Sequence, residues 1–206
     1  MSSSRLPVLA ASWLLVLGAL VVATARPAAA QTYTDADGFY ADIGLALGWN
    51  NLAGGLLPVD NGTMTGFSFG GGYRFNRWAA AEVEFNWVGG GELVRPDGSL
   101  QRASMTSLGV AAVLYPMAFV PTWIPQWVQP NVSFGIGTGL AEQQPVGVGP
   151  AFGSVNQTVL LTRIGVGVDV MLTKHWGTIV EGNYYVTNNG ALTGVGILKI
   201  GLLCRF

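Results

Sequence analysis

Charge, cysteine, histidine and long apolar runs are all scarce in this chain. Only a tenth of its 206 residues are charged, 10 basic and 11 acidic, so nothing indicates a nucleic-acid partner. A single cysteine, Cys204, excludes an intramolecular disulfide, and no cluster of cysteine and histidine predicts a metal site. Beyond residue 30, no apolar run reaches the roughly 20 residues of a membrane-spanning helix. A helical membrane protein is therefore excluded, although half of the residues are hydrophobic.

The first thirty residues have the pattern of a secretory signal peptide. An arginine lies near the start, residues 10–23 carry no charge, and three alanines at 28–30 supply a small-residue cleavage site. An anchor helix is the alternative, but the apolar run is shorter than a membrane span. We expect cleavage before Gln31, which predicts a signal peptide over 1–30 and a single barrel domain over 31–206.

The last thirteen residues alternate between two kinds of side chain. One parity is apolar throughout, and the other carries Lys199, Gly201 and Arg205. Such a strand suits a closed barrel in a bilayer, because a closed barrel leaves no backbone edge unpaired in lipid. The terminal aromatic residue points to the bacterial outer membrane, and we expect the barrel-assembly machinery to recognise the apolar parity of this strand. These residues are Leu198, Ile200, Leu202, Cys204 and Phe206.

Period-two alternation, interrupted by glycine, proline, asparagine and aspartate, predicts eight strands along the chain. Each has about ten or more residues, the length that a tilted strand needs to cross a bilayer. An even number is what single-chain bacterial barrels require, so the predicted fold is an all-β, eight-stranded antiparallel up-and-down transmembrane barrel. The fourth and seventh strands alternate less regularly than the others. The predicted ranges are 39–50, 64–76, 78–90, 104–115, 128–142, 157–172, 176–187 and 194–206.

The connections have two sizes, as this class of barrel requires. Tight periplasmic turns are predicted at 76–78 and 173–175. A third periplasmic connection, 116–127, is long and aromatic, and two interpretations stay open: a docking surface for a partner, or an aromatic girdle at the inner interface. The longer loops face outward and offer a place for an extracellular ligand. They are predicted at 51–63, 89–103, 143–156 and 188–193.

Nine charged residues within the predicted strands share the inward parity. An Arg or Lys facing lipid at the bilayer midplane costs about 2–4 kcal/mol, so a membrane barrel requires this segregation. Because an unpaired buried charge is costly, we expect these acids and bases to pair. The predicted lumen charge network is Asp42, Arg74, Glu82, Glu84, Arg163, Asp169, Glu181, Lys199 and Arg205.

The predicted turns also indicate which charges lie near one another. Two interpretations of the network stay open. In the first it fills the lumen, since an eight-stranded barrel is just wide enough for side chains; in the second the pairs gate an ion path. The turns place Glu181 opposite Lys199 and Arg74 diagonal to Glu82, and they bring Asp42 and Arg205 to the periplasmic ends of adjoining strands.

Four segments carry a family resemblance. They are GGYRFNRWAAAEVEFNWV (71–88), WVQPNVSFGIGTGLAE (127–142), RIGVGVDVMLTKHWGTIVEGNYYVT (163–187) and the ending KIGLLCRF. They resemble the opacity-protein and outer-membrane-protein-A-like eight-stranded barrels of Gram-negative bacteria. The resemblance implies an outer-membrane location, contact with membrane lipids and lipopolysaccharide, and an internal polar network. The family includes adhesins, serum-resistance proteins, membrane-stabilising proteins and small porins.

Catalytic chemistry is not indicated. Membrane hydrolases and acyltransferases commonly need a serine with a histidine, and the one histidine, His175, falls in a predicted turn. The inward serines Ser68, Ser107 and Ser133 have no histidine within reach. The glycine-rich run 135–139 lies inside a strand with no helix after it, so it cannot cradle a phosphate. We predict no catalytic residue, cofactor or metal. The leading hypothesis is a plugged, non-enzymatic structural or surface-interaction protein; a narrow low-conductance pore and a lipid-modifying enzyme are the alternatives.

Overall fold

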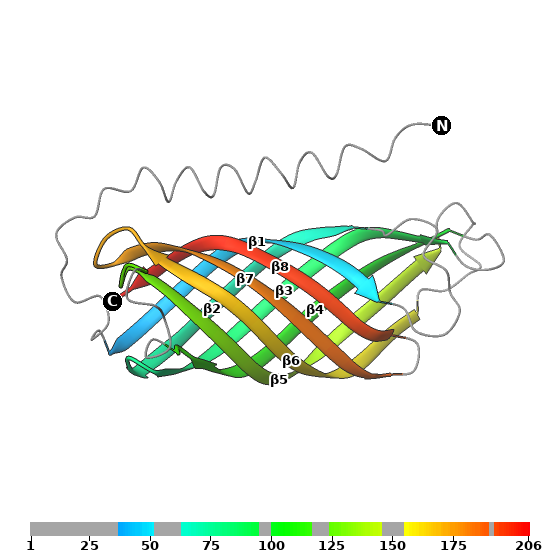
Figure 1. Cartoon of the computed structure of the whole chain (residues 1–206). Coiled ribbons are helices and arrows are strands. Elements are labelled where there is room, and N and C mark those ends of the chain that lie inside the picture. The colour runs from blue at the N-terminus through cyan, green and yellow to red at the C-terminus, as the bar shows by residue number, and fades with distance from the viewer. Residues whose placement is uncertain (1–36, 52–62, 95–99, 117–123, 146–154, 190–191) are drawn as a thin grey trace, which may run out of the picture. The chain divides into compact units, whose positions relative to one another are not determined.

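The computed structural model describes residues 37–51, 63–94, 100–116, 124–145, 155–189 and 192–206. The predicted signal peptide and most of the predicted loop 51–63 lie outside these ranges. None of the described segments is an apolar helix of membrane-spanning length. Instead, eight antiparallel strands pair in chain order and the first pairs with the last, which confirms the predicted closed barrel (Figure 1). The strands are β1 (Gly38–Asn51), β2 (Met64–Asn76), β3 (Ala79–Val94), β4 (Leu100–Leu114), β5 (Val128–Pro145), β6 (Val155–Met171), β7 (Trp176–Asn189) and β8 (Leu192–Arg205).

Tight turns join β2 to β3 and β6 to β7 at one end of the barrel. In the first, Asn76 Oδ1 accepts hydrogen bonds from the backbone N–H groups of Trp78 and Ala79, at 2.8 and 3.0 Å. In the second, Thr173 Oγ1 accepts one from the N–H of Trp176 at 2.9 Å. Such local bonds from a side chain to the backbone favour turns, and both predicted turns are confirmed. We call this end of the barrel the turn end and the opposite end the loop end.

The strands run further toward the loop end than predicted. β3 continues to Val94 and β4 starts at Leu100, so the predicted loop 89–103 was wrong over most of its length. The ladder continues because Gly90 bulges out of it with a φ of 89°, a conformation that favours glycine. The predicted loops 143–156 and 188–193 were also too long, because β5 ends at Pro145, β6 begins at Val155, and only 190–191 separate β7 from β8.

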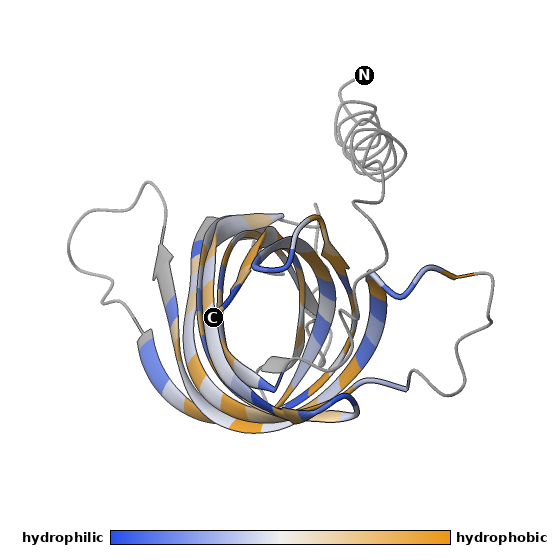
Figure 2. Cartoon of the chain, turned by 90° about the vertical axis from the view of Figure 1, so that its left-hand side faces the viewer, coloured by the Kyte–Doolittle hydropathy of each residue, from blue (hydrophilic) through white to orange (hydrophobic). Residues whose placement is uncertain are grey.

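Side chains alternate between the interior and the outer surface of the barrel. On β1, Leu45 is 73% exposed and its neighbour Ala46 is 1% exposed. β4 keeps this alternation despite its irregular sequence, with Ser107 buried beside the exposed Leu108. Figure 2 looks along the barrel from the turn end and shows the strands as a ring in which hydrophobic and hydrophilic residues alternate. The facing predicted for β1, β2, β5 and β6 is confirmed, although Val170, which has outward parity, is buried.

Apolar side chains fill both ends of the interior. Toward the loop end, ten buried residues pack together and every strand contributes at least one of them. Toward the turn end, six more pack together with the half-buried Trp127 against them. We call these groups the loop-end ring and the turn-end cap. The ring is Ala46, Met64, Val88, Met105, Ala141, Val159, Leu161, Tyr185, Val195 and Ile197; the cap is Tyr40, Ala80, Val113, Tyr115, Met171, Leu203 and Trp127.

The barrel closes where two inward glycines face each other. Gly44 on β1 pairs directly with Gly201 on β8. A Cβ atom on Gly201 would lie 2.7 Å from the Cα of Gly44 and 2.9 Å from the carbonyl carbon of Ile43. Glycine inside a strand commonly marks such a close approach of two backbones. The β1–β8 seam therefore requires a residue without a side chain at this position.

We expect Gly201→Ala to weaken the closed barrel by about 1–3 kcal/mol, the usual cost of overpacking. The control is Gly182→Ala on β7, where the nearest atom to an added Cβ is the Val166 carbonyl oxygen at 4.0 Å. Urea unfolding of the two refolded variants, followed by tryptophan fluorescence, compares their midpoints with that of the wild type. Equal midpoints for both variants would show that the seam tolerates a side chain.

Candidate functional site in the barrel lumen

All nine charged residues with inward parity are buried. Four acids and two bases lie between the loop-end ring and the turn-end cap, as β8 illustrates: Lys199 stands between Ile197 of the ring and Leu203 of the cap. The remaining acid and two bases gather near the turn end. We call the first group the central charge cluster and the second the turn-end polar cluster. The central charge cluster is Asp42, Glu82, Glu84, Arg163, Glu181 and Lys199; the turn-end polar cluster is Arg74, Asp169 and Arg205 together with Gln129.

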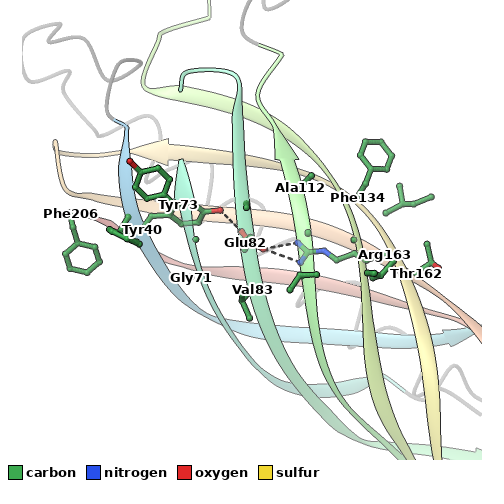
Figure 3. Close-up of a pocket in the computed structure, with 18 residues that line it drawn as sticks. Tyr40, Gly71, Tyr73, Glu82, Val83, Ala112, Phe134, Thr162, Arg163 and Phe206 are labelled. Atoms are coloured by element: carbon green, nitrogen blue, oxygen red, sulfur yellow. Dashed lines mark hydrogen bonds and ion pairs between the residues drawn. The ribbon is translucent and has the colours of Figure 1, made fainter. Parts of the chain in front are cut away.

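Arg163 on β6 holds three carboxylates of the central charge cluster. Its guanidinium lies 3.2 Å from Glu82 Oε1 and 3.2 Å from Glu84 Oε1, both on β3. It also lies 2.6 Å from Glu181 Oε1 on the adjacent strand β7. Tyr40 donates a hydrogen bond to Glu82 Oε2 at 3.1 Å, so the Tyr40–Glu82–Arg163 chain crosses the lumen (Figure 3). The planar guanidinium suits this task because it offers five donors in a fixed geometry.

Lys199 on β8 is the second cation of the central charge cluster, and it is completely buried. Its Nζ lies 2.8 Å from Glu84 Oε2 and 2.9 Å from Asp42 Oδ1. Glu181 is directly opposite Lys199 in the ladder, as predicted, but its Oε2 is more distant, at 3.5 Å. Glu84 and Glu181 therefore each contact both cations, which joins the six residues into one network.

Neutral polar side chains complete the central charge cluster. Asn86 Nδ2 donates to Glu84 Oε1 at 2.7 Å, and the Tyr185 hydroxyl donates to the same oxygen at 2.8 Å. Ser133 donates to Glu181 Oε1 at 3.1 Å. These hydrogen bonds satisfy carboxylate oxygens that are buried away from water, where an unpaired polar group is costly. Because these side chains are neutral, the pattern of charges in the sequence does not identify them. Their inward parity is the feature of the sequence that predicts their place in the lumen.

The turn-end polar cluster is organised around two acceptors, Gln129 and Asp169. Arg74 and Arg205 both donate to Gln129 Oε1, at 2.7 and 2.8 Å. Asp169 lies 3.4 Å from the Arg205 guanidinium, and the Tyr115 hydroxyl donates to it at 3.2 Å. The guanidinium of Arg74 stacks over the Tyr115 ring, 4.0 Å from its centroid. Gln129 is fully buried, and the sequence analysis did not identify it.

Two predicted neighbour positions are confirmed, but the charges at those positions do not pair with each other. Arg74 does lie diagonal to Glu82 in the ladder, but its guanidinium binds Gln129 while Glu82 binds Arg163. Asp42 and Arg205 do lie on adjoining strands, but the register sets Arg205 opposite Tyr40, and Asp42 pairs with Lys199. Both expectations considered only adjacent strands. In a narrow barrel a long side chain reaches across the lumen, as Arg163 on β6 does to Glu82 on β3.

The carboxylates of Glu82, Glu84 and Glu181 converge closely enough to hold a cation. One oxygen of each lies within 4.8 Å of the others, a convergence that the sequence analysis did not identify. Arg163 already contacts all three, so the guanidinium occupies the place that a metal ion would take. The arrangement fits an internal ion-pair network better than a metal site.

The histidine and the serines considered for catalysis lie in different parts of the barrel. His175 is exposed in the turn between β6 and β7, with Nδ1 2.9 Å from the backbone oxygen of Arg205. Ser107 and Ser133 are buried and bonded to Asn86 and Glu181, and Ser68 Oγ is buried with no hydrogen-bond partner among the described residues. No described serine contacts the histidine.

Part of the long connection 116–127 is described, namely residue 116 and residues 124–127. Trp127 packs against the turn-end cap, and its carbonyl accepts a hydrogen bond from the N–H of Met171 at 2.8 Å. Gln129 Nε2 donates to the carbonyl of Gln126 at 3.3 Å. This part of the segment therefore helps to close the turn end. Residues 117–123, which include Phe119 and Trp123, lie outside the described ranges.

Comparisons with known proteins agree with this architecture. A family model described as "Outer membrane protein beta-barrel domain" matches residues 15–206. The crystal structure of Ail, the attachment invasion locus protein of Yersinia pestis, is similar with 17% identity over 83% of this chain and 100% of that one, at a TM-score of 0.58.

Two other solved barrels are similar to the same degree. Neisserial surface protein A has 16% identity over 82% of this chain and 97% of its own, with a TM-score of 0.60. OprG from Pseudomonas aeruginosa has 13% identity over 84% and 97%, with a TM-score of 0.58. At such identities the likeness shows the fold alone. A comparison with curated proteins found no match.

We expect Lys199→Met to destabilise the barrel by about 3–5 kcal/mol, because it leaves buried carboxylates without their cation. Lys174→Met is the matched control: Lys174 is exposed in a turn, and its loss should change stability by less than about 0.5 kcal/mol. The urea midpoints of the two refolded variants measure the difference. A Lys199→Met barrel as stable as the Lys174→Met barrel would mean that the network contributes nothing to folding.

Proposed function

The chain belongs to the family of outer membrane β-barrel domain proteins, and from this premise we propose that it is a non-enzymatic scaffold whose lumen is closed to ions. Its role is structural or surface-interacting. The barrel lies in the outer membrane, where its outer face meets lipid. In this proposal the turn end faces the periplasm and the loop end faces outward, since barrels of this class have short periplasmic turns and longer external loops.

The filled cross-section of the lumen carries this proposal. Every strand contributes an apolar side chain to the loop-end ring, and the side chains of Met64, Leu161 and Ile197 are among the largest fully buried in the barrel. Below the ring, Arg163 and Lys199 bind carboxylates from several strands. An apolar constriction opposes ion passage because water leaves it readily. The ring and the network together support a plug.

A surface role would be carried by the loop end. Loops on a rigid scaffold commonly carry binding, and the closed ladder supplies such a scaffold. Most of the connecting residues at this end lie outside the described ranges. At the other end of the chain, the outward residues of β8 remain our proposed contact for the barrel-assembly machinery. Among them Leu202 is 55% and Phe206 75% exposed, while Leu198, Ile200 and Cys204 are half-buried.

A narrow, low-conductance pore is the second candidate, and the charge imbalance of the central cluster favours it. Four acids share two bases there. Asp42 Oδ2 is buried with no hydrogen-bond partner among the described residues, and Asp42 Oδ1 and Glu181 Oε2 share the single cation Lys199, at 2.9 and 3.5 Å. An excess of acidic oxygens is what a cation path requires.

We expect no discrete current steps from the wild-type barrel in planar bilayers. The double variant Glu181→Gln/Lys199→Gln should be equally silent, because the loop-end ring remains in place. Folding of the protein is checked by its heat-sensitive mobility on gels. If the wild type gave current steps whose size changed in the double variant, the plugged scaffold would be contradicted and the narrow pore would be supported.

Protease treatment of whole cells tests the proposed orientation. Proteinase K should cut within 52–62 or 146–154, which join strands at the loop end. The 116–127 segment at the turn end should stay intact until the outer membrane is permeabilised. Cleavage of 116–127 in intact cells, with the other two segments uncut, would show that the proposed orientation is wrong and that the turn end faces outward.

A further inference from the structure

The outer surface of the barrel has a shallow groove of about 1140 Å³, whose lining extends from Phe39 on β1 to Ile164 on β6. Its smallest outward-facing residues are Gly71 and Ala112, both labelled in Figure 3, and Ala81, and we call these three residues its floor. The larger side chains of Tyr73 and Phe134 stand at its sides. Elsewhere on the outer face most positions carry large apolar residues, so this stretch is hollowed because its floor residues are small.

The ladder brings these residues together from separate strands. Tyr73 pairs with Ala81, Ala81 pairs with Ala112, and Ala112 pairs with Phe134. Each has outward parity, so one row of paired residues runs from an aromatic side chain over two alanines to another aromatic. Gly71 widens the floor beside this row. The groove is therefore a property of the register and cannot be recognised on any single strand.

The groove offers almost no hydrogen-bonding groups. Glu82 and Arg163 approach its floor from the inside, but both are buried and bound to each other. An extended protein segment lying in the groove would leave its backbone groups unpaired, which is costly in an apolar environment. A hydrocarbon chain has no such requirement. Because the barrel lies in a membrane, the hydrocarbon that reaches this face is a lipid acyl chain.

A cation lies beyond the groove, in the turn at the turn end of β2 and β3. Arg77 is exposed in the turn that joins β2 to β3, and its guanidinium lies 4.9 Å from the centre of the Trp78 ring. From Trp78 to the floor residue Ala81 the chain advances by about 10 Å, at roughly 3.3 Å per residue. An arginine at this position is suited to a phosphate oxygen, because its donors match that geometry.

The geometry points to a bound phospholipid, with one acyl chain in the groove and its phosphate at Arg77. The site belongs to this barrel in particular, because it requires both the Gly71, Ala81 and Ala112 floor and a cation in the adjoining turn. It retains one lipid through detergent extraction, while the lipids around the rest of the barrel exchange. The choice of a phospholipid of the inner leaflet over lipid A rests on the orientation proposed above, with the turn end toward the periplasm.

Native mass spectrometry of the barrel, expressed as the full chain and extracted from the outer membrane, tests the site. The wild type should retain one phospholipid. Gly71→Leu should lower retention by about tenfold, because its side chain displaces about two methylene groups of the acyl chain. A Cβ on Gly71 meets only the Tyr40 backbone oxygen at 3.6 Å, so the folded barrel accommodates this variant. Gly182→Leu, another outward glycine with open space, is the matched control and should retain the lipid.

Arg77→Gln tests the contribution of the headgroup to lipid retention separately from that of the acyl chain. It should weaken the retention of phosphatidylglycerol in nanodiscs of defined composition while leaving the gel mobility of the folded barrel unchanged. Equal lipid retention by Gly71→Leu, Gly182→Leu and wild type would overturn the site. Retention of lipid A in place of phospholipid, or of a second copy of the chain, would show that the occupant of the groove is not a phospholipid. Lipid retention does not depend on ion conductance, so these outcomes do not bear on the plugged lumen, which the bilayer recordings test.

Discussion

The closed hydrogen-bonded ladder is the constraint on which the rest of this structure depends. A backbone in lipid must satisfy every N–H and C=O group within the protein, and a sheet does so only when its first and last strands pair. Here the seam is the pairing of β1 with β8, where Gly44 and Gly201 let the backbones approach. Closure then divides all side chains into a lipid-facing set and an enclosed set.

Enclosure explains the chemistry of the lumen. Charged side chains that cannot face lipid must share a narrow interior, and there they bind across it instead of along neighbouring strands. Arg163 and Lys199 each contact three carboxylates, so the barrel's walls are connected through its centre. The loop-end ring above them receives side chains from all eight strands. Together they make the lumen a packed interior, consistent with a scaffold.

The same constraint shapes the outer face. Because outward positions are paired across strands, their side-chain sizes combine into surface relief: aromatic rows where Phe39 meets Tyr73, and a groove where Ala81 meets Ala112. A membrane protein's surface is thus as specific in shape as its interior. In the proposed lipid site, the exposed Arg77 in the turn between β2 and β3 adds a charge beyond one end of that groove.

The sequence by itself determined the barrel, its eight strands and the inward facing of the nine lumen charges, because a period of two is a local property. It also predicted the two tight turns and the Glu181–Lys199 register. Only the tertiary structure decided which charges meet, that Arg74 binds Gln129 instead of Glu82, and that β3 continues past Gly90. Contacts across the lumen and the groove on the wall depend on strand stagger and side-chain reach between distant segments, and no local pattern encodes these.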